Sequence, residues 1–105
     1  MPQYAVIQHH PANICPMTNK TVRNFAKEMF PKLPALGAKL GVKVVTNIHL
    51  DPDHKAFLLL YAKSAEAARD FLVQGGFAHF TEMNFYLVTP VEELLKQADS
   101  MPTIF

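Results

Sequence analysis

The sequence predicts an α+β domain in which two strand–helix–strand units share one antiparallel sheet. Runs of strand length occupy 3–9, 42–50, 55–63 and 81–89, and apolar residues recur at helical spacing between and after them. Because strand–helix–strand crossovers are right-handed, the element order β-α-β-β-α-β-α predicts a ferredoxin-like sheet of spatial order 4-1-3-2 with an extra C-terminal helix. The length of 105 residues is that of one domain, so we assign 1–105 to a single ferredoxin-like domain.

The first half of the chain contains a strand and a broken helix. The stretch "QYAVIQH", 3–9, is rich in the residue types that favour strands. In the helix that follows, five apolar side chains fall on one face: Val22, Phe25, Ala26, Met29 and Phe30. Thr18 or Asn19 is the expected N-cap, and Pro31 ends or kinks the helix because it lacks a backbone donor. A second helical segment ends at Gly41, which suits a left-handed cap.

The second half contains a hairpin, a helix, a strand and a last helix. The turn residues "DPDH", 51–54, join the second and third strands. Ser64 is the expected N-cap of the next helix, and Gly75–Gly76 ends it. The fourth strand leads into 89–92, "TPVE", which has the pattern of a capping box. We expect the tail "SMPTIF", 100–105, to be loosely held or to dock on a neighbour.

Composition and charge exclude several classes of partner. The net charge is +1 and the ten Lys and Arg residues are dispersed, so no basic cluster indicates nucleic acid. A single cysteine cannot form an internal disulfide. The N-terminus does not have the pattern of a signal peptide. The longest apolar run, "AFLLLYA", is too short to cross a bilayer. We therefore expect a soluble cytoplasmic protein that binds neither nucleic acid nor membrane.

The outer face of the sheet is predicted to be apolar. The second strand is expected to direct apolar side chains toward the helices and polar ones away: Val44, Thr46, Ile48 and Leu50 against Lys43, Asn47, His49 and Asp51. The third strand is apolar on both faces: Ala56, Leu58 and Leu60 against Phe57, Leu59 and Tyr61. Leaving a whole apolar face in water is costly. A homodimer that packs sheet on sheet is the expected solution.

Strand direction predicts that all the histidines lie at one rim of the sheet. The first and second strands end where the third and fourth begin, and five histidines occur at these ends: His9, His10, His49, His54 and His79. Cys15, Met17, Asp51 and Asp53 belong to the same rim. Imidazole binds Zn, Ni, Cu or Fe(II), and a thiolate adds a soft donor. The candidate ligands are therefore His9, His10, His49 and His54, with Cys15 as an auxiliary ligand. Because His9 and His10 are adjacent on a strand, they face opposite sides, so one ion takes only one of them.

Other interpretations of these residues remain open. Histidines and aspartates at strand ends are also ordinary turn residues. Cys15 precedes a helix N-terminus, which favours a reactive thiolate, but a lone cysteine also serves as a small packing residue. Asp51 or Asp53 beside His54 is a possible acid–base pair. The alternative function is a cofactor-independent oxygenase or isomerase, in which His49, His54 or Cys15 acts on a ligand in an apolar pocket.

Several segments are similar to a known superfamily. They are "VIQHH", "GVKVV", "FLLLYAKSAEAARDFL", "GGF" and "NFYLVTP", and together they cover most of the chain. The chain resembles the dimeric α/β-barrel superfamily, and within it uncharacterised small families whose first strand ends in a His-His pair, some of them described as nickel-binding. The resemblance implies a homodimer and a metal at His9 or His10. Other members are oxygenases, isomerases or haem-degrading enzymes. Haem degraders use a tryptophan, which this chain lacks. No reaction follows from the sequence.

Overall fold

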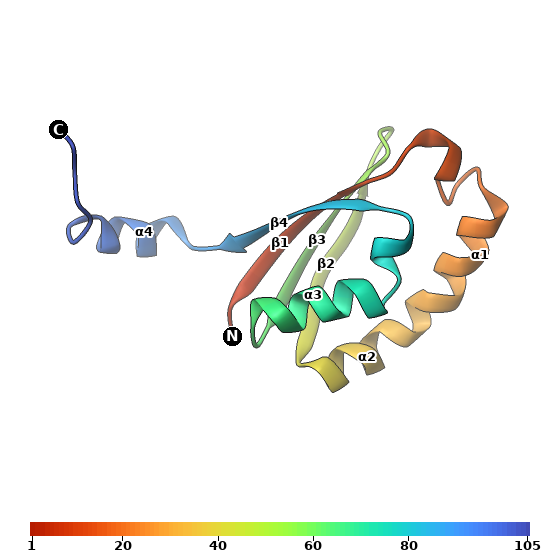
Figure 1. Ribbon diagram of the computed structural model, residues 1–105, viewed down its shortest axis with the longest axis horizontal. Helices are drawn as coiled ribbons and strands as arrows, with labels where there is room; N and C mark the ends of the chain where they lie inside the picture. Colours follow the sequence, from red (N-terminus) through yellow and green to blue (C-terminus); the bar gives the residue numbers. More distant parts are fainter.

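The computed structural model describes residues 1–105 and has two layers, a four-stranded antiparallel sheet and helices that cover one of its faces (Figure 1). The strand order is β2-β3-β1-β4, which is the predicted 4-1-3-2 order counted from the other edge. The α+β, ferredoxin-like fold class is therefore confirmed. The strands are β1 (Gln3–His9), β2 (Val42–Leu50), β3 (Lys55–Ala62) and β4 (Glu82–Val88). The helices are α1 (Lys20–Met29), α2 (Leu33–Leu40), α3 (Ala65–Gln74) and α4 (Val91–Ala98). Three single 3₁₀ turns are η1 (Ala12–Ile14), η2 (Phe30–Lys32) and η3 (Phe77–His79).

The helix ends follow the side chains that the sequence places there. Asn19 caps α1 by accepting a hydrogen bond from a backbone N–H of the first turn at 3.0 Å. Pro31 lies in η2, which separates α1 from α2. Gly41 ends α2 with φ of 76°, a left-handed conformation that only glycine adopts without strain. Ser64 caps α3 in the same way as Asn19 caps α1.

The last helix starts differently from the prediction. The capping box expected at 89–92 does not form, because Pro90 keeps an extended backbone with ψ of 141° and is itself the N-cap. The helix therefore begins at Val91, one residue later than a Thr89 cap requires, and no side chain caps it. α4 leaves the rest of the molecule and extends beyond the sheet (Figure 1).

The core lies between the sheet and the helices. Its largest fully buried side chain is Phe71 of α3, which packs beside Phe77 with the two ring centres 6.1 Å apart. The strands contribute the opposite wall, and twelve residues form one buried cluster. They are Tyr4, Val6, Leu33, Val42, Leu58, Leu60, Ala62, Ala67, Ala68, Phe71, Leu72 and Phe77.

A β-bulge in β2 overturns part of the predicted face assignment. The pairing of β2 with β3 shifts between Val44 and Thr46. Before the shift Val44 lies opposite the buried Leu60, as expected, but after it Asn47 lies opposite the buried Leu58. Residues directly opposite each other in a sheet share a face, and an inserted residue reverses the alternation beyond it. The second half of β2 is therefore inverted. Asn47 and His49 face the helices, whereas Thr46, Ile48 and Leu50 face away.

The face of the sheet that carries no helix is called the open face here. All four strands contribute apolar side chains to it, according to the strand pairing. They are Ala5, Ile7, Ile48, Leu50, Phe57, Leu59, Tyr61, Tyr86 and Val88. None of the helices is long and apolar enough to cross a membrane.

Candidate metal centre

The strand pairing brings the ends of β1 and β2 to the same rim as the starts of β3 and β4. His9 lies opposite Lys55 of β3 and Glu82 of β4, and His49 lies opposite Ala56. His79 belongs to η3, immediately before β4. The histidines thus lie at one rim of the sheet. Their side chains project to different faces of the sheet, and only those on the same face can come into contact.

His10 and His54 are neighbours because they form the next pair beyond the last residue of β1 and the first residue of β3. The backbone N–H of His10 donates to the carbonyl oxygen of His54 at 3.1 Å. Side chains opposite each other across an antiparallel pair project on the same side, with Cβ atoms about 4.5–5.5 Å apart. Accordingly, the two imidazole rings lie 5.4 Å apart, centre to centre, at 61° to each other. The backbone ladder itself positions this pair.

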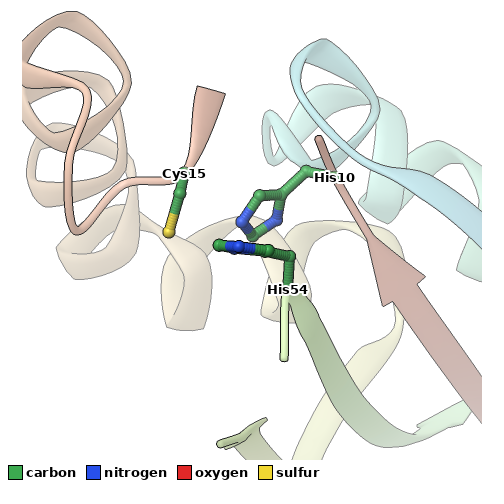
Figure 2. A group of neighbouring side chains, drawn as sticks. All are labelled: His10, Cys15 and His54. Atoms are coloured by element: carbon green, nitrogen blue, oxygen red, sulfur yellow. The ribbon is translucent and has the colours of Figure 1, made fainter. Parts of the chain in front are cut away.

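Cys15 reaches the same place from the loop between β1 and α1. Figure 2 shows its sulfur pointing toward the His10 and His54 rings. One ligand atom from each residue, a ring nitrogen or the sulfur, lies within 4.8 Å of the other two. Zn–N bonds of about 2.0–2.1 Å and Zn–S bonds of about 2.3 Å are within reach after small rotations of these side chains. The three residues define a group that we call the His10–Cys15–His54 centre.

The loop that carries Cys15 is held by specific hydrogen bonds. Arg23 of α1 donates from its guanidinium to the carbonyl oxygens of Pro16 and Met17 at 3.0 and 2.6 Å. The carbonyl oxygen of Cys15 accepts from the backbone N–H groups of Thr18 and Asn19 at 3.0 and 2.7 Å. These four hydrogen bonds, at Cys15 and at the two residues after it, restrict where Cys15 lies. The position of Cys15 therefore depends on α1 as well as on its own loop.

If the His10–Cys15–His54 centre holds a metal ion, replacing Arg23 with alanine should weaken its binding without removing a ligand. The two carbonyl oxygens would lose their charged donor, Cys15 would lose its fixed position, and loss of such a supporting contact costs about 10–100-fold in metal affinity. Competitive titration with a chromogenic chelator measures the change. Lys27→Ala, one turn further along α1, is the matched control and should bind as the wild type does. Equal affinities of the Arg23→Ala and Lys27→Ala proteins would contradict this role of Arg23.

Two nitrogen atoms of the centre are buried without a hydrogen-bond partner. They are Nε2 of His10, a residue only 9% exposed, and Nδ1 of His54. Cys15, which faces them, is 3% exposed and forms no disulfide. Buried polar atoms are nearly always paired in proteins, since an unpaired one costs about 1–3 kcal/mol. A metal ion would satisfy both nitrogens and the thiolate at once.

The environment of His10 keeps its imidazole neutral, the form that binds metals. Burial lowers the pKa of His10 below its ordinary value of 6.5, because a charged ring would be poorly solvated there. The positive charges of His54, His49 and His9 lower this pKa further. A neutral imidazole has a free lone pair at neutral pH, so His10 does not need to lose a proton before it binds a metal.

Stability of the metal-free chain should fall as the pH drops below about 6.5, and His10 should contribute to this fall. Since the folded-state pKa of His10 is lowered, the unfolded chain binds the proton first. The contribution is therefore fully present above the unfolded pKa of about 6.5 and is lost between that value and the folded pKa. Urea unfolding with a chelator present, at pH 7.5 and pH 5.5, measures it. We expect a smaller loss in His10→Gln than in the wild type or His9→Gln. An unchanged loss in His10→Gln would refute this contribution.

The structure does not bring the other sequence-predicted ligands into the centre. His9 faces the open face, where Nε2 lies 3.4 Å from a carboxylate oxygen of Glu82. His49 faces the helix side because of the bulge, and its Nδ1 lies 2.6 Å from Oδ1 of Asp51. His79, which the sequence places at the rim but not among the candidate ligands, packs with its ring centre 5.1 Å from that of Phe25.

The remaining polar residues of this rim have structural contacts. Oδ1 of Asp53 accepts a hydrogen bond from the backbone N–H of His54 at 2.7 Å. This hydrogen bond is the main reason that the pKa of Asp53 is lowered. Such a bond from an aspartate to the next backbone amides is typical of turns. Met17 is exposed and lies outside the centre.

A cavity of about 400 Å³ adjoins the centre, and sequence reasoning missed one of its residues. Gln8 lines this cavity together with His10 and Cys15, is buried, and has no partner for its Nε2 atom. The rest of the lining is mainly apolar and includes Phe77 and Phe80. The alternation of Val6, Gln8 and His10 on one face was the available signal. A larger cavity of about 570 Å³ lies between α2 and β2 and contains no unpartnered buried side chain.

The arrangement suits a transition metal better than Mg²⁺ or Ca²⁺. Two imidazole nitrogens and a thiolate are the ligands of Zn, Ni, Cu and Fe sites, whereas Mg²⁺ and Ca²⁺ take oxygen ligands. Structural zinc sites use four protein ligands, and catalytic ones use three and leave a position open. The centre supplies three ligands, and the cavity lies beside it.

The comparisons with known proteins concern the fold alone. The chain matches no protein family model and no curated protein sequence. Among solved structures, it is similar to the de novo designed protein Ferredog-Diesel, with a TM-score of 0.50 and 11% sequence identity over 82% of this chain and 84% of the design. At that identity only the arrangement of strands and helices is shared. The chain is an α+β protein with a ferredoxin-like fold and a His–Cys–His cluster that could hold a metal ion.

Proposed function

We propose that the chain binds one divalent transition-metal ion at the His10–Cys15–His54 centre. The observation that carries this proposal is a pair of buried, unpartnered imidazole nitrogens that face a buried free thiol from a separate segment. The His10–His54 pair alone, or Cys15 alone, would not indicate a metal site, because such residues often only fill space in a protein interior. Together they form a donor set with no other partner.

The donor set favours zinc or nickel as the ion. Both bind mixed nitrogen and sulfur ligands. The resemblance to nickel-binding small proteins also supports nickel. A thiolate ligand requires a reduced cysteine, which supports a reducing compartment such as the cytoplasm.

The ion would retain one position for water or a small molecule. Three protein ligands leave a tetrahedral ion one ligand short, and the 400 Å³ cavity with the buried Gln8 amide lies beside it. A ligand in this cavity would meet an apolar wall, one polar amide and the ion. Binding at such a position is the basis of both metal handling and metal-dependent chemistry.

Metal content of untagged protein tests this proposal. After dialysis against Ni²⁺ or Zn²⁺ and removal of free ions, we expect about one ion per chain. The adjacent histidines provide matched variants, because His10 faces the centre and His9 faces the opposite side of the sheet. His10→Ala should lose the ion and His9→Ala should keep it. Protein without bound metal after dialysis would refute the proposal, and so would equal loss in both variants.

A second candidate function is cofactor-independent catalysis in the same cavity. The observation that favours it is the pair of His49 and Asp51, 2.6 Å apart, of which both residues line the cavity. A carboxylate that orients an imidazole is the usual arrangement of a general base. The two proposals differ in their requirement for metal, so a chain that binds small organic ligands equally well with and without a chelator would favour the second.

A further inference from the structure

Residues 90–105 form an arm that makes no hydrogen bond or ion pair with the rest of its own chain. α4 and the tail project from the end of β4 away from both layers (Figure 1). Each hydrogen bond and ion pair of the arm joins two of its own residues. Leu94 and Leu95 on the apolar side of α4 are 52% and 67% exposed, and Ile104 and Phe105 are fully exposed.

The chain exposes more surface than a stable monomer of its size. Its accessible surface is 7210 Å², whereas folded monomers of 11.8 kDa expose about 5,900 Å². The excess of about 1,300 Å² is larger than the ~800 Å² that each partner buries in a standard interface. The radius of gyration is 16.3 Å, compared with about 13 Å for a compact chain of this length. The isolated chain therefore leaves uncovered an area of surface that is large enough to form an interface with a partner.

The open face of the sheet is a second uncovered surface in the same chain. It presents apolar side chains from all four strands, including Ile48 and Tyr86, which are about half exposed. The arm starts at the end of β4, a strand of this sheet. In a two-fold dimer the same patches of both copies are buried. A second copy of the chain would therefore bury both the arm and the open face.

The homodimer expected from the sequence would bury the open face. Beyond that expectation, we propose that the arm, residues 90–105, packs against the second copy of the chain in the same two-fold dimer. The arm carries three acidic residues and one lysine. Helices that lie on membranes are instead rich in Lys and Arg on their polar side, so the charge of the arm favours a protein partner. The arm proposal does not depend on metal binding, since the centre lies at the opposite end of the strands.

Light scattering of the full chain after gel filtration measures the molar mass and so tests whether the arm forms part of a dimer interface. Two variants of the arm that change the net charge by the same amount are compared. The wild type should have the mass of two 11.8 kDa chains. Leu94→Glu/Leu95→Glu adds two negative charges to the apolar side of α4 and should raise the dimer dissociation constant at least ~100-fold, because buried anchors dominate such interfaces. Lys96→Glu changes the charge equally on the polar side and should remain dimeric. Tyr86→Glu on the open face should dissociate the dimer independently.

Each alternative result overturns the proposal. A monomeric wild type would show that nothing in a second copy covers the arm. A dimer that withstands the double leucine variant would place the interface elsewhere, and dissociation in Lys96→Glu as well would show a charge effect. The substituted side chains are exposed in the isolated chain, so circular dichroism should remain unchanged in all variants. Binding of the wild type to neutral lipid vesicles, lost in the double leucine variant, would assign the arm to membranes instead.

Discussion

Replacing Cys15 with serine is expected to lower the affinity of the chain for Zn²⁺ at least ~100-fold and to leave the fold unchanged. Serine has nearly the size of cysteine, so the buried position stays filled, but its hydroxyl does not provide the thiolate that binds the ion. Only His10 and His54 would remain as ligands from this centre. Isothermal titration at pH 7.5 in the presence of a reductant measures the change.

The control for this substitution is another polar residue of the same cavity. His49 lines the cavity but is paired with Asp51 and does not belong to the centre. His49→Ala should therefore bind Zn²⁺ with nearly the wild-type affinity. Wild-type affinity in Cys15→Ser, together with a large loss in His49→Ala, would show that the ion binds at the outer part of the rim, between His49 and Asp51.

Replacing Phe71 with alanine is expected to lower the free energy of unfolding by about 3–5 kcal/mol. Phe71 is completely buried between the sheet and α2 and packs against Phe77. The loss comes from the transfer of its ring to water and from the cavity that remains. Most small domains are stable by only about 5–15 kcal/mol, so the variant should be largely unfolded in moderate urea.

A neighbouring position on the same helix provides the comparison. Val73 of α3 is half exposed, and Val73→Ala should change the free energy of unfolding by less than about 1 kcal/mol. Urea titrations of the three proteins, with a chelator present, measure the difference from the shift in midpoint at constant slope. Similar midpoints for Phe71→Ala and the wild type would contradict the assignment of the core.

The fold was predictable because its signals are local and agree with one another. The caps at Asn19 and Ser64, the break at Pro31 and the left-handed Gly41 all occur where short-range chemistry places them. The handedness of the crossovers then leaves one sheet order. Pro90 is the exception: whether a proline is the first helical residue or the cap depends on one torsion angle.

The sequence predicted where the candidate site lies, but it did not predict which of the residues at that rim meet. The rim follows from strand direction, but membership of the centre depends on which face each side chain occupies. The bulge after Val44 reverses the faces on which Ile48 and His49 lie. Residues 42–50 contain no glycine, which is the usual sequence signal of a bulge. The approach of Cys15 depends on the loop conformation held by Arg23, a contact that no periodic pattern encodes.

The absorption spectrum of the Co²⁺-substituted protein tests the centre most directly, because it reports the ligands themselves. If His10, Cys15 and His54 bind one ion, addition of Co²⁺ should produce intense visible bands of a four-coordinate site and a thiolate-to-cobalt charge-transfer band in the near ultraviolet, saturating at one ion per chain. The charge-transfer band should disappear in Cys15→Ser. A weak spectrum typical of six-coordinate Co²⁺, without a thiolate band in the wild type, would contradict the centre.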